Sequence, residues 1–215
     1  RDPEMSRGLG DVYKRQELVA YAETIHMLGV RFLPSGLSRF IQLPLHELTN
    51  QRICADEVTN FFDASFAERL CEEDNFGDRI KIIEELFIKS LYKYDLQTDP
   101  QIAFAIEQIN RHQGKLPVQS LVEDICLCQR QFERKFKMNT GYTPKIYSRI
   151  MQFKNAVDLL RSATCDNLLS TAVHAGYYDV PHLSREIKRM SGNTPYSFLA
   201  LPSPEEEVTL TYVEA

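Results

Sequence analysis

The stretch FERKFKMNTGYTP at residues 132–144 is matched 51 residues later by LSREIKRMSGNTP at residues 183–195. Both copies carry an apolar residue, an Arg, a second apolar residue and a Lys, followed by Gly and Thr-Pro. The matched pairs are Phe132 with Leu183, Arg134 with Arg185, Phe136 with Ile187, Lys137 with Lys188, Gly141 with Gly192, Thr143 with Thr194 and Pro144 with Pro195. A repeat at a fixed offset indicates that one small structural unit occurs twice.

Each copy predicts a short basic helix followed by the start of a second helix. Apolar residues four positions apart seat one face of a helix in a core. The Arg and Lys, three positions apart, lie on a neighbouring face that can reach outward. Gly then ends the helix in a left-handed conformation, and Thr-Pro caps and starts the next helix. We therefore assign Phe132, Phe136, Leu183 and Ile187 to the core.

Another short helix is expected directly before each basic helix. The apolar residues that mark these helices are Val118, Leu121, Val122 and Ile125 in residues 117–126, and Leu169, Ala172 and Val173 in residues 168–175. In the second unit, Gly176 relieves the turn between the helices and Asp179 can cap the helix that follows. A helix, a tight turn and a basic helix, occurring twice, form the pattern of a doubled helix-turn-helix.

Between the two units, residues 143–162 are predicted to form one long linker helix. Its expected buried stripe consists of Ile146, Ile150, Phe153, Val157 and Leu160. About 20 residues at about 1.5 Å each give a helix of about 30 Å, close to the ~34 Å of one turn of B-DNA.

The part of the chain before residue 100 predicts less. Residues 25–33, IHMLGVRFL, favour a strand, and Pro34-Ser35-Gly36 favours a turn. Residues 56–96 have a helical pattern that residues 75–78, which include Gly77, should break. Residues 97–100 are the expected linker, with Asp99 as a helix cap and Pro100 in the first helical position. The predicted fold is mostly α, with two helix-turn-helix units preceded by a short β remnant and a helical segment.

Composition and charge limit the class of protein. The chain has 43% apolar and 26% charged residues. It has no apolar run near the ~18 residues of a membrane span and no secretory segment, so we expect a cytoplasmic protein. Residues 1–99 carry 12 basic and 18 acidic residues, whereas residues 100–200 carry 13 and 8, a net charge of +5. A basic segment favours binding to a polyanion, although a solvated helical surface explains it equally well. The five scattered cysteines favour neither a disulfide framework nor a metal site, and no cofactor is expected.

Residues 100–200 resemble the DNA-binding domain of the AraC/XylS family over their whole length. Residues 172–199, AVHAGYYDVPHLSREIKRMSGNTPYSFL, are similar to the signature segment of that family. Residues 128–160, CQRQFERKFKMNTGYTPKIYSRIMQFKNAVDLL, resemble its first recognition helix and linker helix. The sequence departs from the family pattern at Leu183 and Ile187, where Phe is usual, and at Cys128, where a helix-capping residue is usual, so the first recognition helix should fray slightly.

The resemblance implies a bacterial, sequence-specific transcription regulator that reads two successive major grooves of double-stranded DNA. The implied DNA-binding residues are Arg130, Glu133, Arg134 and Lys137 in the first unit, and Pro181, His182, Arg185 and Lys188 in the second. Glu133 would accept from a cytosine amino group, and His182 would either contact DNA or pack over the helix end. Further expectations are RNA polymerase as a partner, a homodimer through residues 56–96, and association with the nucleoid. Activation and repression both remain open, as does the effector.

The resemblance also implies a division of the chain. Residues 99–201 would form the DNA-binding domain, and residues 17–98 would be the remnant of a sensor region with a helical linker. Residues 1–16 contain SRGLGDVYKRQ, which resembles translated adapter sequence, and we expect them to be foreign to the fold. Residues 202–215 would form an acidic tail.

The sequence also bears on two other classes of function. An enzyme is not expected, because the chain has no phosphate-binding loop, no HExxH and no nucleophile elbow. A helical protein-interaction or dimerisation module without specific DNA binding is the main alternative, and residues 56–96 would carry it. DNA affinity that falls steeply with salt would distinguish the two.

Overall fold

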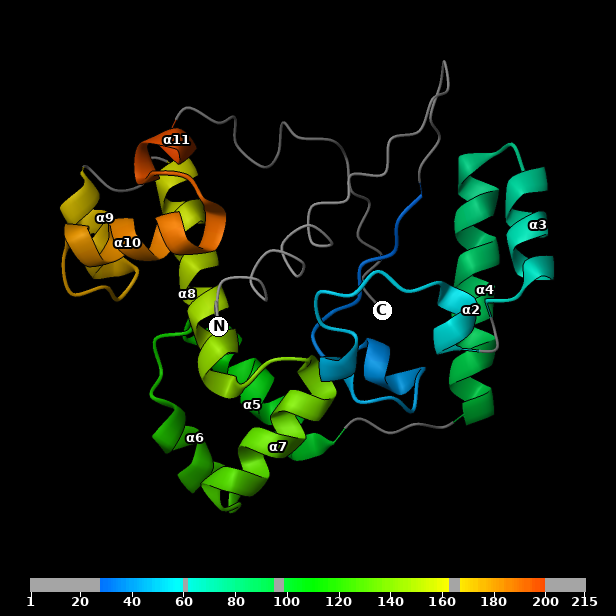
Figure 1. The fold of residues 1–215 in the computed structure, drawn as a ribbon, viewed down its shortest axis with the longest axis horizontal. Helices are drawn as coiled ribbons and strands as arrows, with labels where there is room; N and C mark the ends of the chain where they lie inside the picture. Colours follow the sequence, from blue (N-terminus) through cyan, green and yellow to red (C-terminus); the bar gives the residue numbers. More distant parts are fainter. Residues whose placement is uncertain (1–27, 60–61, 95–98, 163–166, 200–215) are drawn as a thin grey trace, which may run out of the picture. The chain divides into compact units, whose positions relative to one another are not determined.

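The computed structural model describes residues 28–59, 62–94, 99–162 and 167–199. These residues are mostly helical and contain no strand (Figure 1). The chain divides into two compact units, Arg1–Leu43 with Glu47–Asp95 and Pro44–His46 with Leu96–Ala215. Residues 1–16 and 202–215, for which the sequence predicts an adapter-derived segment and an acidic tail, lie outside the described residues. None of the described helices is long and apolar enough to cross a membrane.

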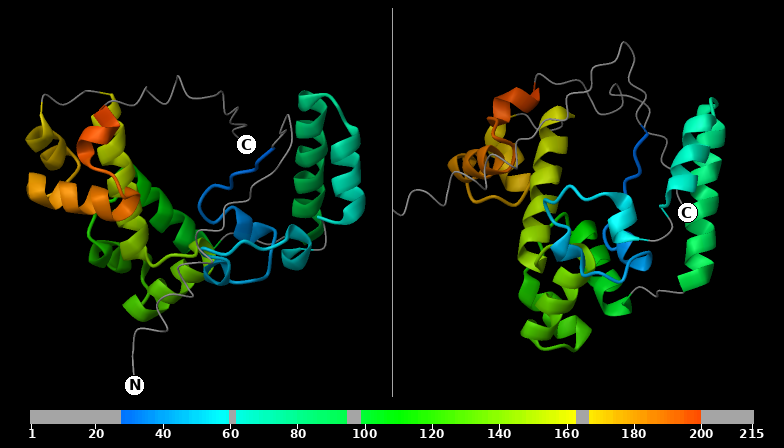
Figure 2. Two further views of the ribbon diagram at one scale, coloured as in Figure 1. Left: turned by 45° about the horizontal axis from the view of Figure 1, so that its top comes forward. Right: turned by 45° about the vertical axis from the view of Figure 1, so that its right-hand side comes forward.

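The part of the chain before residue 95 contains short helical turns and two longer helices. The elements are the 3-10 helices η2 (Leu37–Arg39) and η3 (Leu45–Glu47), and the α-helices α2 (Ala55–Val58), α3 (Ala64–Glu72) and α4 (Phe76–Tyr94). Helices α3 and α4 lie side by side (Figures 1 and 2). The rings of Phe32, Phe40 and Phe62 all pack against Phe87 of α4, with centroids 4.9–5.9 Å apart. Edge-on aromatic packing therefore joins the segment before α3 to α4.

Local capping explains where these helices begin. The carboxylate of Asp63 accepts from the backbone N–H of Phe66 at the start of α3, and the side-chain oxygen of Asn75 accepts from Gly77 at the start of α4. The predicted break in the helical pattern exists, but it lies at residues 73–75, and Gly77 lies within the first turn of α4. The predicted turn at Pro34-Ser35-Gly36 is confirmed, with Gly36 N–H donating to Leu33 O at 2.8 Å.

The predicted β remnant is wrong for residues 28–33, which form no strand, while residues 25–27 lie outside the described residues. A strand needs a neighbour to pair with its backbone N–H and C=O groups. The described part of the chain supplies no such neighbour, so apolar and β-branched composition alone did not produce a strand.

The second unit consists of helices around a long central helix. The order is α5 (Pro100–Arg111), α6 (Val118–Ile125), α7 (Gln129–Thr140), α8 (Pro144–Arg161), α9 (Leu168–His174), α10 (Val180–Ser191) and α11 (Pro195–Leu199). Helix α8 runs from the group α5–α7 to the group α9–α11 (Figures 1 and 2). It contributes Tyr147 to one apolar core and Ala156, Val157 and Leu160 to another. The predicted pair of helix-turn-helix units joined by a linker helix is therefore confirmed.

The repeat occupies equivalent places in the two units. Phe132 and Phe136 of α7 are fully buried, as are Leu183 and Ile187 of α10. Gly141 and Gly192 end these two helices with φ angles of 83° and 77°. The hydroxyl of Thr143 caps α8, and Pro144 occupies its first turn, as predicted. Asp99 and Pro100 likewise begin α5 as predicted, with Asp99 accepting from Gln101 N–H.

The predicted buried stripe of α8 is wrong at its start. Ile146 is 45% exposed, whereas Tyr147 beside it is buried. Ile150 and Phe153 are half-buried, and only Val157 and Leu160 of the predicted stripe are buried. Because α8 packs against one core with its first turns and another with its last turns, its buried face changes direction along the helix.

Candidate nucleic-acid interface

Helix α7 presents one charged side to solvent. Phe132 and Phe136 anchor the opposite side, so Arg130, Arg134 and Lys137 are exposed. Glu133 is half-buried, and its carboxylate accepts from the side-chain amide of Gln129 one turn earlier at 2.9 Å. All four residues predicted from the sequence therefore lie along α7, and three of them are free to reach a ligand.

Helix α10 repeats this arrangement. Leu183 and Ile187 are buried, while Pro181, Arg185 and Lys188 are exposed. The Arg185 Nε donates to the Pro181 carbonyl at 3.2 Å, which holds the first part of its side chain along the helix. The same offset from a buried apolar residue thus places Arg134 and Arg185 at equivalent exposed positions.

His182 has a more structural role than the other predicted residues of α10. Its Nδ1 lies 3.4 Å from the backbone nitrogen of Tyr178, and its ring packs edge-on against Tyr177 with centroids 5.2 Å apart. Of the two roles left open by the sequence, packing over the end of the helix is therefore observed. Asp179 accepts from His182 N–H at 2.7 Å and caps α10, as predicted.

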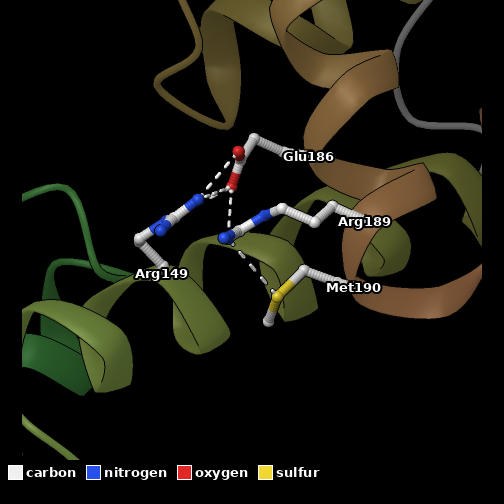
Figure 3. Close-up of polar contacts among 4 residues, drawn as sticks. All are labelled: Arg149, Glu186, Arg189 and Met190. Atoms are coloured by element: carbon white, nitrogen blue, oxygen red, sulfur yellow. Dashed lines mark hydrogen bonds and ion pairs between the residues drawn. The ribbon is translucent and has the colours of Figure 1, made fainter. Parts of the chain in front are cut away.

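Sequence reasoning missed an ion-pair cluster that joins α8 to α10 (Figure 3). Arg149 Nη2 donates to both carboxylate oxygens of Glu186 at 2.7 and 2.8 Å, and Arg189 Nη2 donates to Glu186 at 3.0 Å. Partial burial of Glu186 favours its neutral form, but the two guanidinium groups outweigh this effect and lower its pKa. Partners 37 residues apart cannot be predicted from helical spacing, so no local signal could have found this pair.

The aromatic residues at the turn before α10 differ in environment. Tyr177 is buried, and burial, with a smaller contribution from the charge of Glu186, raises its pKa to about 12. Tyr178 is 90% exposed and stands beside the start of α10. This exposed ring is a second feature that the sequence prediction did not single out.

A family model described as a helix-turn-helix domain matches residues 121–200, from α6 to α11. Residues 121–200 therefore carry a helix-turn-helix domain. This match confirms the helix-turn-helix pattern that the repeat predicted, and it agrees with the class that the resemblance implied, a DNA-binding transcription regulator. The matched family is one of transcription regulators rather than of enzymes. No curated protein sequence matches the chain.

Three solved structures that resemble about half of this chain share 20–22% sequence identity with it. The DNA-binding domain of AdpA, a global transcriptional factor in complex with a target DNA, matches 48% of this chain and 92% of its own, with TM-score 0.44. The C-terminal domain of AraT, a response regulator from Geobacillus stearothermophilus, matches 51% and 92%, with TM-score 0.45. The xylose-binding transcription activator XylR matches 50% of this chain, with TM-score 0.44, and this chain covers 28% of its length.

The two basic helices of the helix-turn-helix domain, α7 and α10, begin differently. Asp179 caps α10 with its side chain, whereas Cys128 at the start of α7 makes no capping hydrogen bond. The tight turn before α7 contains Cys126 with φ 53°, where the second unit has Gly176 with φ 79°. A left-handed conformation is less favourable for a residue with a side chain than for Gly, so the first unit combines a less favourable turn with an uncapped helix.

Proposed function

We propose that this chain is a sequence-specific transcription regulator that places α7 and α10 in two successive major grooves of double-stranded DNA. One observation carries the proposal: both helices bury their apolar side and leave equivalent cationic residues exposed. The 18 residues of α8 extend about 27 Å at about 1.5 Å per residue, close to the ~34 Å turn of B-DNA. A linker helix of this length suits two recognition helices that bind the same side of the duplex.

Direct reading of bases is assigned to the two equivalent arginines. Arg134 and Arg185 are exposed, and a guanidinium can donate two parallel hydrogen bonds to the O6 and N7 of guanine. Glu133 would accept from a cytosine amino group in a neighbouring base pair. His182 would act mainly by holding the start of α10, since its Nδ1 already lies near Tyr178 N–H and its ring already packs against Tyr177.

The remaining exposed residues would set the position of each helix on the DNA backbone. Arg130, Lys137 and Lys188 would contact phosphates, and Pro181 would pack against the sugar-phosphate chain near the start of α10. Phosphate contacts fix register without carrying sequence information. They also release counterions, which makes binding weaken steeply as salt rises.

Residues 17–98 are proposed to be the remnant of a sensor region, and residues 56–96 within it are proposed to mediate a homodimer. Ile88 and Tyr92 lie one turn apart on α4 and are 52% and 87% exposed. An exposed apolar pair on a long helix favours a second copy of the chain as the partner. RNA polymerase is the further proposed partner, and the proposed location is the cytoplasmic nucleoid.

Selection from a randomised DNA library with the full chain tests the proposal. We expect two short specified blocks whose centres lie about one helical turn, 10–10.5 base pairs, apart. Binding to the selected duplex should fall steeply between low and moderate salt. Recovery of no sequence preference, with DNA affinity that does not depend on salt, would instead favour the protein-interaction module.

A further inference from the structure

We propose that Arg149 and Gln152 of α8 are positioning residues that set the spacing between the two DNA sites that the protein accepts. The inference rests on the proposed function and concerns what holds the second helix-turn-helix unit at a fixed angle on the linker helix. The two residues lie three positions apart, so they share one side of α8.

Arg149 fixes the second recognition helix directly. Its guanidinium donates to both oxygens of Glu186, and a further bond runs from Nε to Glu186 at 3.3 Å (Figure 3). The side chains of Arg149 and Glu186 are 35% and 16% exposed, so solvent screens this pair less than it screens the intrahelical pairs of the same unit. A bidentate pair of this kind is directional, whereas apolar packing is not. It therefore holds the rotation of α10 about its own axis.

Gln152 fixes the turn that precedes the same helix. Its amide nitrogen donates to the carbonyls of Ala175 and Gly176 at 3.0 and 2.9 Å. These carbonyls follow the last residue of α9 and have no partner within a continuing helix. The turn between α9 and α10 is thereby tied to the middle of α8, one turn away from the Arg149 pair.

The first helix-turn-helix unit meets α8 at the same place. Gly114, in the turn between α5 and α6, lies so close to α8 that an added Cβ would overlap the carbonyl oxygen of Ser148. Lys115, the next residue, donates to the carbonyl of His174 in α9 at 3.3 Å. Residues 148–152 of α8 therefore contact both the turn between α5 and α6 and the turn before α10. Because α6 and α7 follow the first of these turns, this shared contact region holds the two recognition helices as a fixed pair.

Two recognition helices that are fixed relative to each other should favour one spacing between their two DNA sites. One extra base pair between the two sites moves the second site by about 3.4 Å and turns it by about 34° around the helix axis. A fixed pair cannot follow this change, whereas a loosened pair can. Arg149 and Gln152 should therefore affect which spacing is preferred more than they affect binding to either site alone.

The test uses the full chain and the duplex selected from the randomised library. Its affinity is compared with that for duplexes carrying one added or one removed base pair between the specified blocks. For the unchanged protein, each spacing change should cost about ten-fold in affinity, comparable to a mismatched base pair. In the variant E186Q combined with Q152A, that ratio should shrink to within about three-fold.

Matched variants separate this effect from charge and from general damage. E107Q removes the same charge from a pair within α5, and Q119A removes an exposed amide from α6. Both control variants should keep the ten-fold ratio between the selected duplex and the duplexes with altered spacing. If the double variant unfolds, the single variants E186Q and Q152A take its place in the comparison.

The inference is overturned if folded variants keep the ratio of the unchanged protein, or if the unchanged protein itself tolerates the added base pair. Failure of the library to yield any specified sequence would overturn the proposed function, and with it this inference.

Discussion

At the scale of single residues, we expect sequence-specific DNA binding to depend most on Arg134 and Arg185. Substituting either with Ala should weaken specific DNA binding by about 1–3 kcal/mol, because each loses a bidentate contact with a guanine. Sequence preference should relax in one block for R134A and in the other for R185A. Because both side chains are exposed, the free energy of unfolding should change by less than about 0.5 kcal/mol.

Competition binding with single-base variants of the selected duplex measures this prediction. An even loss of affinity across all sequences, with a weaker salt dependence, would show that the arginines contact phosphates instead. Early melting with unchanged sequence preference would show that they are structural.

Gly114 and Gly192 form a matched pair for testing close packing. Both have positive φ, 74° and 77°, but an added Cβ at Gly114 would overlap α8, whereas at Gly192 it would meet nothing within 4 Å. G192A should cost about 1–2 kcal/mol for the left-handed conformation alone. G114A should cost clearly more, because the backbone of α8 must also shift. Urea unfolding measures both, and equal losses would contradict the close contact.

The lowered pKa of Glu186 predicts a pH dependence of stability. A carboxyl whose pKa in the folded state lies below its unfolded value of 4.5 stabilises the fold above that pH. This contribution is lost as the pH falls below 4.5 through the pKa of the folded state. E186Q should therefore lose less stability than the unchanged protein on acidification through this range. Chemical unfolding at a series of pH values measures it, and identical pH profiles would contradict the assignment.

At the scale of elements, helix ends were predicted well because their causes are local. Asp99, Thr143 and Asp179 cap the helices they precede, and Gly141 and Gly192 end the two basic helices. The wrong predictions concern features that depend on contacts with residues distant in the sequence. Residues 28–33 lack a neighbouring strand, and the first core buries Tyr147 of α8 rather than Ile146.

The distance along the sequence between contact partners also explains why the angle between α10 and α8 was not predicted. Side chains that face outward from one helix follow from the repeat, so the exposure of Arg134 and Arg185 was predictable. The angle between α10 and α8 is held by Arg149, Glu186 and Gln152, whose partners lie 23 to 37 residues apart. Helical spacing carries no information about such pairs.

The missing cap of α7 gives a prediction at the same scale. Cys128 occupies the N-cap position with an extended backbone, and its side chain makes no hydrogen bond there. C128S should supply an acceptor for the first turn and stabilise the domain by about 0.5–1 kcal/mol. Thermal unfolding measures the change, with D179A as the reverse control, because Asp179 makes the equivalent bond in α10. A loss of stability in C128S would show that the thiol already has a packing role.

At the scale of the whole molecule, the segment with a net positive charge is also the segment that contains both apolar cores of the second unit. Both apolar cores of the second unit are formed by residues between 102 and 198, and residues 100–200 carry 13 basic and 8 acidic residues. We therefore propose residues 99–201 as an independent domain. The acidic character of the full chain would then belong to the parts outside it, which explains how a DNA-binding chain has a net charge of −5.

The central claim is that this segment alone binds DNA through two basic helices. The most direct measurement is the affinity of a fragment of residues 97–201 for the selected duplex over a range of salt concentrations. We predict that the fragment is folded and that the logarithm of its binding constant falls steeply and linearly with the logarithm of the salt concentration. We also predict that it binds the selected duplex more tightly than a scrambled one. A folded fragment that shows no salt-dependent DNA binding would contradict the account.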